Sequence, residues 1–188
     1  MRVDQKAAAR AINDFLIALG FDPEREPLLR GTGERVAQAY LDEFCRGYCV
    51  EIDSLLKEHL LKGEADEVIV HQLSVTTMCP HHLLPASGHA TVAYEPCGHL
   101  VGFGVIARVV DACSRRLALQ EQIGQNVADA LMKHLSPSWA ACRLVMHHTC
   151  ISATSEACAH ANVETIALKG DCTEQKKQLV YQSLGVGR

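Results

Sequence analysis

The segment Val75-Thr76-Thr77-Met78-Cys79-Pro80-His81-His82-Leu83-Leu84-Pro85 carries a thiol and two imidazoles within a few positions. A second cluster of the same residue types, Met146-His147-His148-Thr149-Cys150-Ile151, follows later in the chain. Two thiolates and one imidazole form a ligand set known for catalytic zinc, with the fourth position left for water. The two segments together therefore predict a metal site.

Cys79 and His82 have the Cys-x-x-His spacing that places two ligands on one ion, and Cys150 is the candidate third ligand. His81 and His148 then remain as unligated imidazoles beside the metal, suited to proton transfer near neutral pH. The alternative is that the cysteines are ordinary buried thiols, which are common in protein cores. Residue types and spacing alone leave both interpretations open.

The composition of the whole chain indicates a globular protein of 188 residues, which fits one domain. The net charge of −4 gives no reason to expect nucleic acid or membrane as a partner. Nine cysteines are an odd number without disulfide-scaffold spacing, and the polar N-terminus does not resemble a signal peptide. We therefore expect a cytoplasmic protein with reduced thiols, and no apolar run approaches the ~20 residues that span a bilayer.

Hydrophobic periodicity predicts that the chain begins with helices and continues with alternating pairs of strands and helices. We predict an N-terminal helical region over residues 1–66 and a single catalytic region over residues 67–188. Thr32 is the expected N-cap of the second helix. The predicted helices cover residues 8–19, 32–46, 55–61, 105–112, 117–131 and 173–184, and the predicted strands cover 68–75, 88–94, 100–104, 142–148 and 163–168. This order is typical of an α+β fold.

The run Cys79-Pro80-His81-His82-Leu83-Leu84-Pro85 resembles the Cys-Glu-His-His-Leu-Leu-Pro signature of the GTP cyclohydrolase I family. Further similar segments occur in the family's order and extend over about residues 22 to 170. They are Thr32-Gly33-Glu34-Arg35-Val36-Ala37, Gly88-His89-Ala90-Thr91-Val92-Ala93-Tyr94-Glu95-Pro96, Arg115-Arg116-Leu117, Leu119-Gln120-Glu121 and His148-Thr149-Cys150.

The resemblance implies a tunnelling fold, in which two helices back a four-stranded antiparallel sheet. It also implies that several copies close into a ring, usually a decamer in bacteria, with sites at subunit interfaces. Zn²⁺ is the implied cofactor and a small heterocycle the implied substrate. None of these properties follows from composition or periodicity.

The same resemblance implies roles for individual residues. Cys79, His82 and Cys150 would hold zinc, which lowers the pKa of water so that hydroxide forms near neutral pH. In the family that water adds at C8 of the guanine ring, the ring opens and formate leaves. His148 corresponds to the histidine that protonates the purine, and His81 to the second catalytic histidine; a structural role is the alternative for His81.

Gln120 and Glu121 correspond to the pair that recognises guanine. A carboxylate accepts two hydrogen bonds from adjacent N–H groups, and a ligand without those donors leaves a buried charge unpaired. The alternative for Glu121 is a solvated position on a helix surface. His160 is a further candidate substrate contact, with a solvent-exposed loop position as its alternative.

The chain departs from the family pattern where the triphosphate binds. Val105 and Gly104 stand in place of the family's lysine and serine, and Thr154 in place of an arginine, so that only Arg35 and Arg108 remain of the cationic set. A triphosphate needs several cationic partners. Two lost charged hydrogen bonds, at ~1.5–3 kcal/mol each, predict much weaker triphosphate binding.

From these departures we predict a zinc-dependent hydrolase that opens a guanine-like or related heterocycle lacking a triphosphate, with Arg35 and Arg108 holding a carboxylate or one phosphate. The alternative is an authentic GTP cyclohydrolase I that makes 7,8-dihydroneopterin triphosphate and formate. A non-catalytic ring protein that binds a pterin or purine is a further alternative. Another tunnelling-fold activity, such as nitrile reduction, agrees less well with the metal-ligand spacing.

Overall fold

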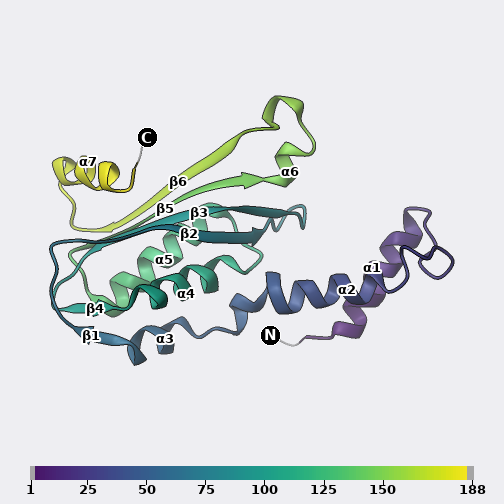
Figure 1. The fold of residues 1–188 in the computed structure, drawn as a ribbon, viewed down its shortest axis with the longest axis horizontal. Helices are drawn as coiled ribbons and strands as arrows, with labels where there is room; N and C mark the ends of the chain where they lie inside the picture. Colours follow the sequence, from purple (N-terminus) through teal and green to yellow (C-terminus); the bar gives the residue numbers. More distant parts are fainter. Residues whose placement is uncertain (1–2, 186–188) are drawn as a thin grey trace.

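The computed structural model describes residues 3–185, and its centre is a four-stranded antiparallel sheet (Figure 1). The strand order is β2-β3-β5-β6, and every neighbouring pair is antiparallel. A separate small sheet pairs β1 with β4. The strands are β1 (Leu60–Lys62), β2 (Val68–Met78), β3 (Pro85–Glu95), β4 (His99–Val101), β5 (Trp139–His148) and β6 (Asn162–Gly170).

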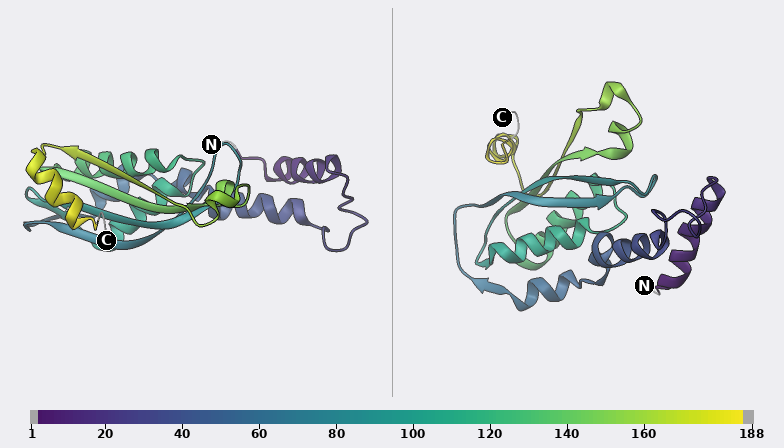
Figure 2. Two further views of the ribbon diagram at one scale, coloured as in Figure 1. Left: turned by 90° about the horizontal axis from the view of Figure 1, so that it is seen from above. Right: turned by 45° about the vertical axis from the view of Figure 1, so that its right-hand side comes forward.

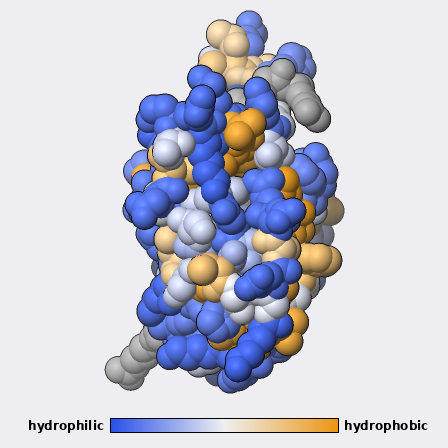
Figure 3. Space-filling model, turned by 90° about the vertical axis from the view of Figure 1, so that its left-hand side faces the viewer, coloured by the Kyte–Doolittle hydropathy of each residue, from blue (hydrophilic) through white to orange (hydrophobic). Residues whose placement is uncertain are grey.

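Helices α4 (Phe103–Ser114) and α5 (Gln120–Leu135) cover one face of the large sheet, whereas α7 (Glu174–Ser183) lies on the opposite face (Figures 1 and 2). A four-stranded antiparallel sheet backed by two helices agrees with the predicted α+β arrangement and is consistent with the tunnelling fold. The end of the molecule farthest from the N-terminal helices is mainly hydrophilic, with small dispersed hydrophobic areas (Figure 3).

The alternation of side chains along β5 shows why these residues form a strand between two layers. Ala140, Cys142, Leu144 and Met146 are fully buried in the core shared with α4 and α5. The intervening Trp139 and Ala141 belong to a second core cluster, which also contains Val180 and Leu184 of the C-terminal segment. Even-numbered positions of β5 therefore face α5, and this parity reaches His148 at the end of the strand.

Strand β2 contains a β-bulge near its middle. The register with β3 shifts between Val70 and Leu73, and Gln72 has a left-handed φ of 57°. Before the bulge Val68 and Val70 pack against the main core, and after it Leu73 and Val75 do so. The extra residue thus changes which parity of the strand faces the helices.

The N-terminal part forms a helical arm that projects beyond the sheet (Figures 1 and 2). The prediction that Thr32 caps the second helix was wrong, because Gly31 occupies the N-cap with a φ of 73° and Thr32 is the first helical residue. The arm consists of α1 (Gln5–Ala18), α2 (Thr32–Ala39) and the π-helical turn η1 (Tyr40–Phe44). The 3-10 turn η2 (Arg46–Cys49) and α3 (Ile52–Glu58) follow and lie against α4.

Three short segments differ from the sequence prediction. The strand predicted over 100–104 ends at Val101, because α4 begins at Phe103. The helix predicted over 55–61 ends at Glu58, because Leu60 and the next two residues pair with β4 instead. A short helix, α6 (Thr149–Ser152), and a 3-10 turn, η3 (Glu156–Cys158), follow β5. Since β1 pairs with a strand beyond residue 66, the division of the chain at that residue stays a prediction. Within residues 3–185, every helix falls short of the length and apolar character that a membrane crossing requires.

Candidate active site

The loop between β2 and β3 carries the first two candidate ligands in a closed turn. The amide of Leu83 donates to the carbonyl of Cys79, and the amide of Cys79 donates to the carbonyl of Leu84, both at 2.9 Å. Leu83 has a φ of 53°, a left-handed conformation that is uncommon outside glycine. This turn folds the chain back so that Cys79 Sγ and His82 Nδ1 lie 3.5 Å apart.

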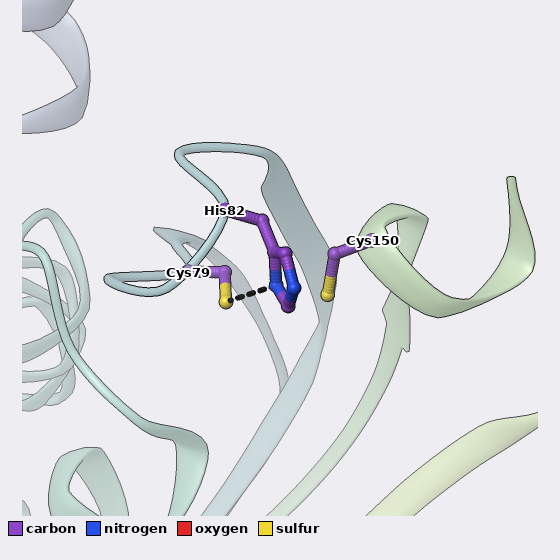
Figure 4. A group of neighbouring side chains, drawn as sticks. All are labelled: Cys79, His82 and Cys150. Carbon is purple, nitrogen blue, oxygen red and sulfur yellow. Dashed lines mark hydrogen bonds between the residues drawn. The ribbon is translucent and has the colours of Figure 1, made fainter. Parts of the chain in front are cut away.

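Cys150 approaches the same point from α6, directly after β5 (Figure 4). The ligand atoms of Cys79, His82 and Cys150 all lie within 4.8 Å of one another, and the three side chains lie side by side with the imidazole between the two sulfurs. Ligands on one tetrahedral zinc, with Zn–S near 2.3 Å and Zn–N near 2.05 Å, lie about 3.5 Å apart. The donor types and the Cys79–His82 separation therefore fit a zinc ion.

The Cys150 thiol ionises less readily than a free cysteine. Burial raises the pKa of Cys150, and the neighbouring Cys79 raises it further. Two thiolates at this distance repel one another unless a cation lies between them. The pair is therefore electrostatically suited to a divalent cation.

His148 enters the same cavity because it continues the even-numbered face of β5. Its Nε2 lies 2.7 Å from Oε1 of Gln120, the first residue of α5. The Gln120 amide nitrogen donates to the carbonyls of Leu144 and Val163, at 3.1 and 3.0 Å. Because both carbonyls are acceptors, the oxygen of the amide must face the ring, and Nε2 of His148 must carry a proton.

The electrostatic surroundings of His148 favour its neutral form. Burial lowers its pKa, the nearby Glu121 carboxylate partly opposes this effect, and His147 lowers the pKa further. With Nε2 engaged by Gln120, Nδ1 is the ring nitrogen left to accept a proton. The neutral imidazole is thus an acceptor at Nδ1 and a donor at Nε2.

These groups share one cavity of about 300 Å³, within the range of small-molecule sites. Seven of the nine predicted site residues line it: Cys79, His81, His82, Gln120, Glu121, His148 and Cys150. His147 and His160 do not line it; His147 lies on the other face of the sheet, in a hollow with His89, and His160 is exposed.

The two predicted arginines lie outside this cavity. Arg35 is in the helical arm, where its guanidinium donates to the Arg30 carbonyl and to Oγ1 of Thr32, both at 2.9 Å. Arg108 is exposed on α4. Among the described residues, no lysine or arginine lines the cavity of a single chain.

Sequence reasoning missed the hydroxyl groups that hold the site together. Thr149 Oγ1 donates to the Pro85 carbonyl at 2.6 Å, which ties the Cys150 segment to the end of the Cys79 loop. The Tyr40 hydroxyl donates to the Leu83 carbonyl at 2.6 Å from the helical arm. Both acceptors are backbone carbonyls, so no pairing of side-chain types in the sequence indicates these contacts.

The family model for GTP cyclohydrolase I matches residues 8–184. The chain belongs to the GTP cyclohydrolase I family. A "GTP cyclohydrolase 1" of Nitrosospira multiformis is 39% identical over 159 residues, which cover 84% of this chain and 82% of that protein. The relative in Chlorobaculum tepidum, with the same name, is 38% identical over 86% of this chain and 71% of its own length. A "GTP cyclohydrolase 1" of Brucella canis is 37% identical over 92% of this chain and 81% of its own length.

Among solved structures, an apo archaeosine synthase QueF-Like matches 59% of this chain and all of its own, with 16% identity and a TM-score of 0.49. The family assignment rests on the family model and the sequence relatives. As a member of this family, the chain is a hydrolase that acts on C–N bonds of cyclic amidines.

The relatives correct the prediction of a substrate without a triphosphate. That prediction relied on Val105 and Thr154 standing where the family has cations, whereas relatives that share 37–39% of their residues over most of this chain are named GTP cyclohydrolase 1. The physical error lies in the count of charges. Arg35 and Arg108, which keep the family pattern, also lie outside the cavity of their own chain, so the cations present in one chain do not measure the charge of its substrate.

Proposed function

We propose that this protein is a GTP cyclohydrolase I, which converts GTP and water to 7,8-dihydroneopterin triphosphate and formate. The observation that carries the proposal is the shared cavity in which Cys79, His82 and Cys150 converge beside His148, whose ring is held by Gln120. This arrangement combines a metal-ligand set with a positioned proton-transfer group in a chain of the GTP cyclohydrolase I family.

Cys79, His82 and Cys150 would hold a zinc ion, as their donor types and the 3.5 Å Cys79–His82 contact support. When bound, zinc supplies the acidity that turns water into a nucleophile near neutral pH. Three protein ligands leave one position of a tetrahedral ion for water, as in other catalytic zinc sites. Because the thiols must stay reduced to bind metal, we also propose a cytoplasmic location.

His148 would exchange a proton with the purine at Nδ1, while its Nε2–H stays bonded to Gln120. The Gln120 contact keeps the imidazole from rotating, so the same nitrogen faces the substrate throughout. His81 lines the cavity next to the ligand His82 and would serve as the second proton-transfer group. Positioned acid–base groups of this kind accelerate reactions by about 10²–10⁴-fold.

Glu121 would recognise the guanine edge. It lies in the first turn of α5, lines the cavity, and is close enough to His148 to influence its pKa. A carboxylate there accepts hydrogen bonds from the 2-amino group and the adjacent ring N–H of guanine. Purines without the amino group would leave one carboxylate oxygen without a donor, which disfavours them.

We further propose a ring-shaped homo-oligomer, with the decamer as the expected size and sites between subunits. Arg35 and Arg108 support this because both are exposed and neither reaches the cavity of its own chain. A triphosphate requires cationic partners, so a neighbouring copy would contribute these arginines to the site.

The decisive experiment incubates the zinc-loaded protein with GTP and measures formate together with the fluorescent, oxidised pterin. We expect equal amounts of both products from GTP, and neither from a His148→Ala variant that still binds zinc. Formate release from guanosine but not from GTP would contradict the proposal. Tight binding of GTP without any turnover would instead identify a non-catalytic pterin- or purine-binding protein.

A further inference from the structure

The turn that carries Cys79 and His82 accepts a hydrogen bond from the N-terminal helical arm. Leu83, the residue after His82, adopts a left-handed φ although it has a bulky side chain, and the residue is 52% exposed. A strained conformation without burial of its own needs an external contact to persist. The contact that the structure supplies is the 2.6 Å hydrogen bond from the Tyr40 hydroxyl to the Leu83 carbonyl.

Tyr40 is itself held in a fixed position. It begins the π-helical turn η1, a rare geometry that is frequent at functional sites. Its ring packs edge-on against Phe44, with centroids 5.6 Å apart, and its carbonyl accepts a 2.8 Å hydrogen bond from the Cys45 amide. Burial raises the pKa of Tyr40, and Cys45 raises it further, so the phenol stays protonated and able to donate.

Tyr40 stands at the junction of α2 and η1, with α-helical backbone angles. Helix α2 runs regularly to Ala39, and η1 then adds one residue per turn before the chain turns at Cys45. The segment η1 lies against β2, the strand that leads into the Cys79 loop. The helical arm therefore contacts the loop that carries Cys79 through the hydrogen bond from the Tyr40 hydroxyl to the Leu83 carbonyl.

We propose that Tyr40 is a positioning residue for the metal centre, which holds the Leu83 carbonyl so that Cys79 and His82 stay at ligand distance. The inference rests on the proposed zinc site and assigns part of its affinity to the N-terminal arm. Tyr40 does not touch the ligand atoms; it acts through the turn that carries them. Its removal leaves all three ligands in the chain but releases the turn that orients two of them.

The test replaces only the hydroxyl, with Tyr40→Phe in the full-length protein. Zn²⁺ affinity is measured by competition with a chromophoric chelator, and Co²⁺ absorption reports thiolate ligation without any assay of activity. Tyr48→Phe is the matched control, because Tyr48 is 42% exposed in the neighbouring turn η2 and contacts Arg116 through its ring face rather than its hydroxyl. Hydrogen exchange of the Cys79 and Leu83 amides in the metal-free protein provides a second measurement.

We expect Tyr40→Phe to weaken Zn²⁺ binding about tenfold, at the lower end of the range for groups that orient metal ligands. The Cys79 and Leu83 amides should exchange faster in this variant, and Tyr48→Phe should match the parent in both measurements. Unchanged affinity and exchange in Tyr40→Phe would overturn the inference while the zinc site stands. A parent protein that shows no thiolate–Co²⁺ absorption would overturn both the zinc site and the inference.

Discussion

Oε1 of Gln120 lies 2.7 Å from Nε2 of His148, and the two strand carbonyls bonded to the Gln120 amide nitrogen fix the orientation of this contact. Gln120 lines the cavity but is only 2% exposed, so little of its side chain is free to contact a ligand. The guanine-binding role of Gln120 stays a prediction; the geometry shows that its amide oxygen holds the His148 ring.

We therefore expect Gln120→Leu to lower kcat by about 10- to 100-fold, part of the about 10²–10⁴-fold that a positioned acid–base group supplies. KM for GTP should change little, because Glu121 remains to recognise guanine. Steady-state kinetics of formate release separates the two constants, with Gln125→Leu as an exposed control on the same helix. A rise in KM at unchanged kcat would instead favour direct contact between Gln120 and the base.

Removal of one metal ligand should abolish zinc binding without unfolding the chain. In Cys79→Ser we expect the zinc content to fall from one ion per chain to near zero, whereas Cys97→Ser, at an exposed cysteine, should keep it. A ligand that binds only the native state stabilises it. Zinc at 100 times its Kd should therefore raise the free energy of unfolding of the parent protein by about 2.7 kcal/mol. Equal thermal shifts in parent and Cys79→Ser would argue against this ligand set.

Gly88 permits the close approach of β3 and β5. A Cβ at this position would lie 2.0 Å from the Val145 carbonyl oxygen and 2.7 Å from Cα of Met146, both backbone atoms. We expect Gly88→Ala to destabilise the protein by at least about 1–3 kcal/mol, the usual range for overpacking. Thermal unfolding measures the change, and Gly104→Ala, whose Cβ meets nothing within 4 Å, should leave the melting temperature unchanged or raised.

The carboxylate of Asp53 should contribute to acid sensitivity. Hydrogen bonds from Lys133 and His134 lower its pKa to about 2, and His134 Nε2 lies 2.8 Å from Oδ1. A depressed pKa stabilises the native state fully above the unfolded value of about 3.9. That stabilisation is lost as the pH falls through the folded value of about 2.

Unfolding followed between pH 2 and pH 6 therefore separates Asp53→Asn from the parent. We expect the variant to be slightly less stable above pH 4, with the difference shrinking toward pH 2. The effect is small because the side chains of Asp53 and Lys133 are solvent-exposed. A constant difference across the whole range would exclude proton linkage through Asp53.

Arg108 provides a test of triphosphate recognition. Arg108 of one copy would bind a phosphate of the GTP held in the cavity of a neighbouring copy. Arg108→Ala should then raise KM for GTP by about 10- to 100-fold, as expected for loss of a charged hydrogen bond worth ~1.5–3 kcal/mol. The KM for guanosine, which lacks phosphates, should stay the same in a parallel assay. Equal effects on both substrates would indicate a structural role for Arg108.

The strands of the large sheet and the closeness of Cys79 to His82 were predictable, because each follows from a short-range pattern. Alternation along β5 directs His148 toward α5 and His147 away from it, and the Cys-x-x-His spacing brings two ligands together. Strand β1 was not predictable, since three residues carry little periodicity and their pairing with β4 is a tertiary choice. The substrate prediction failed because it inferred binding energy from residue types whose positions in space were unknown.

The β-bulge at Gln72 determines which face of the sheet each later residue of β2 occupies. Without that extra residue, Val75 and Thr77 would face the opposite side of the sheet. Cys79, which follows Thr77 by two residues, would then enter the loop facing away from the cavity. The geometry of the candidate metal site thus depends on the number of residues in β2 at Gln72, several residues before Cys79. Over evolution, deletion of Gln72 would therefore move the later residues of β2 to the opposite face of the sheet, and a substitution alone would not restore their orientation.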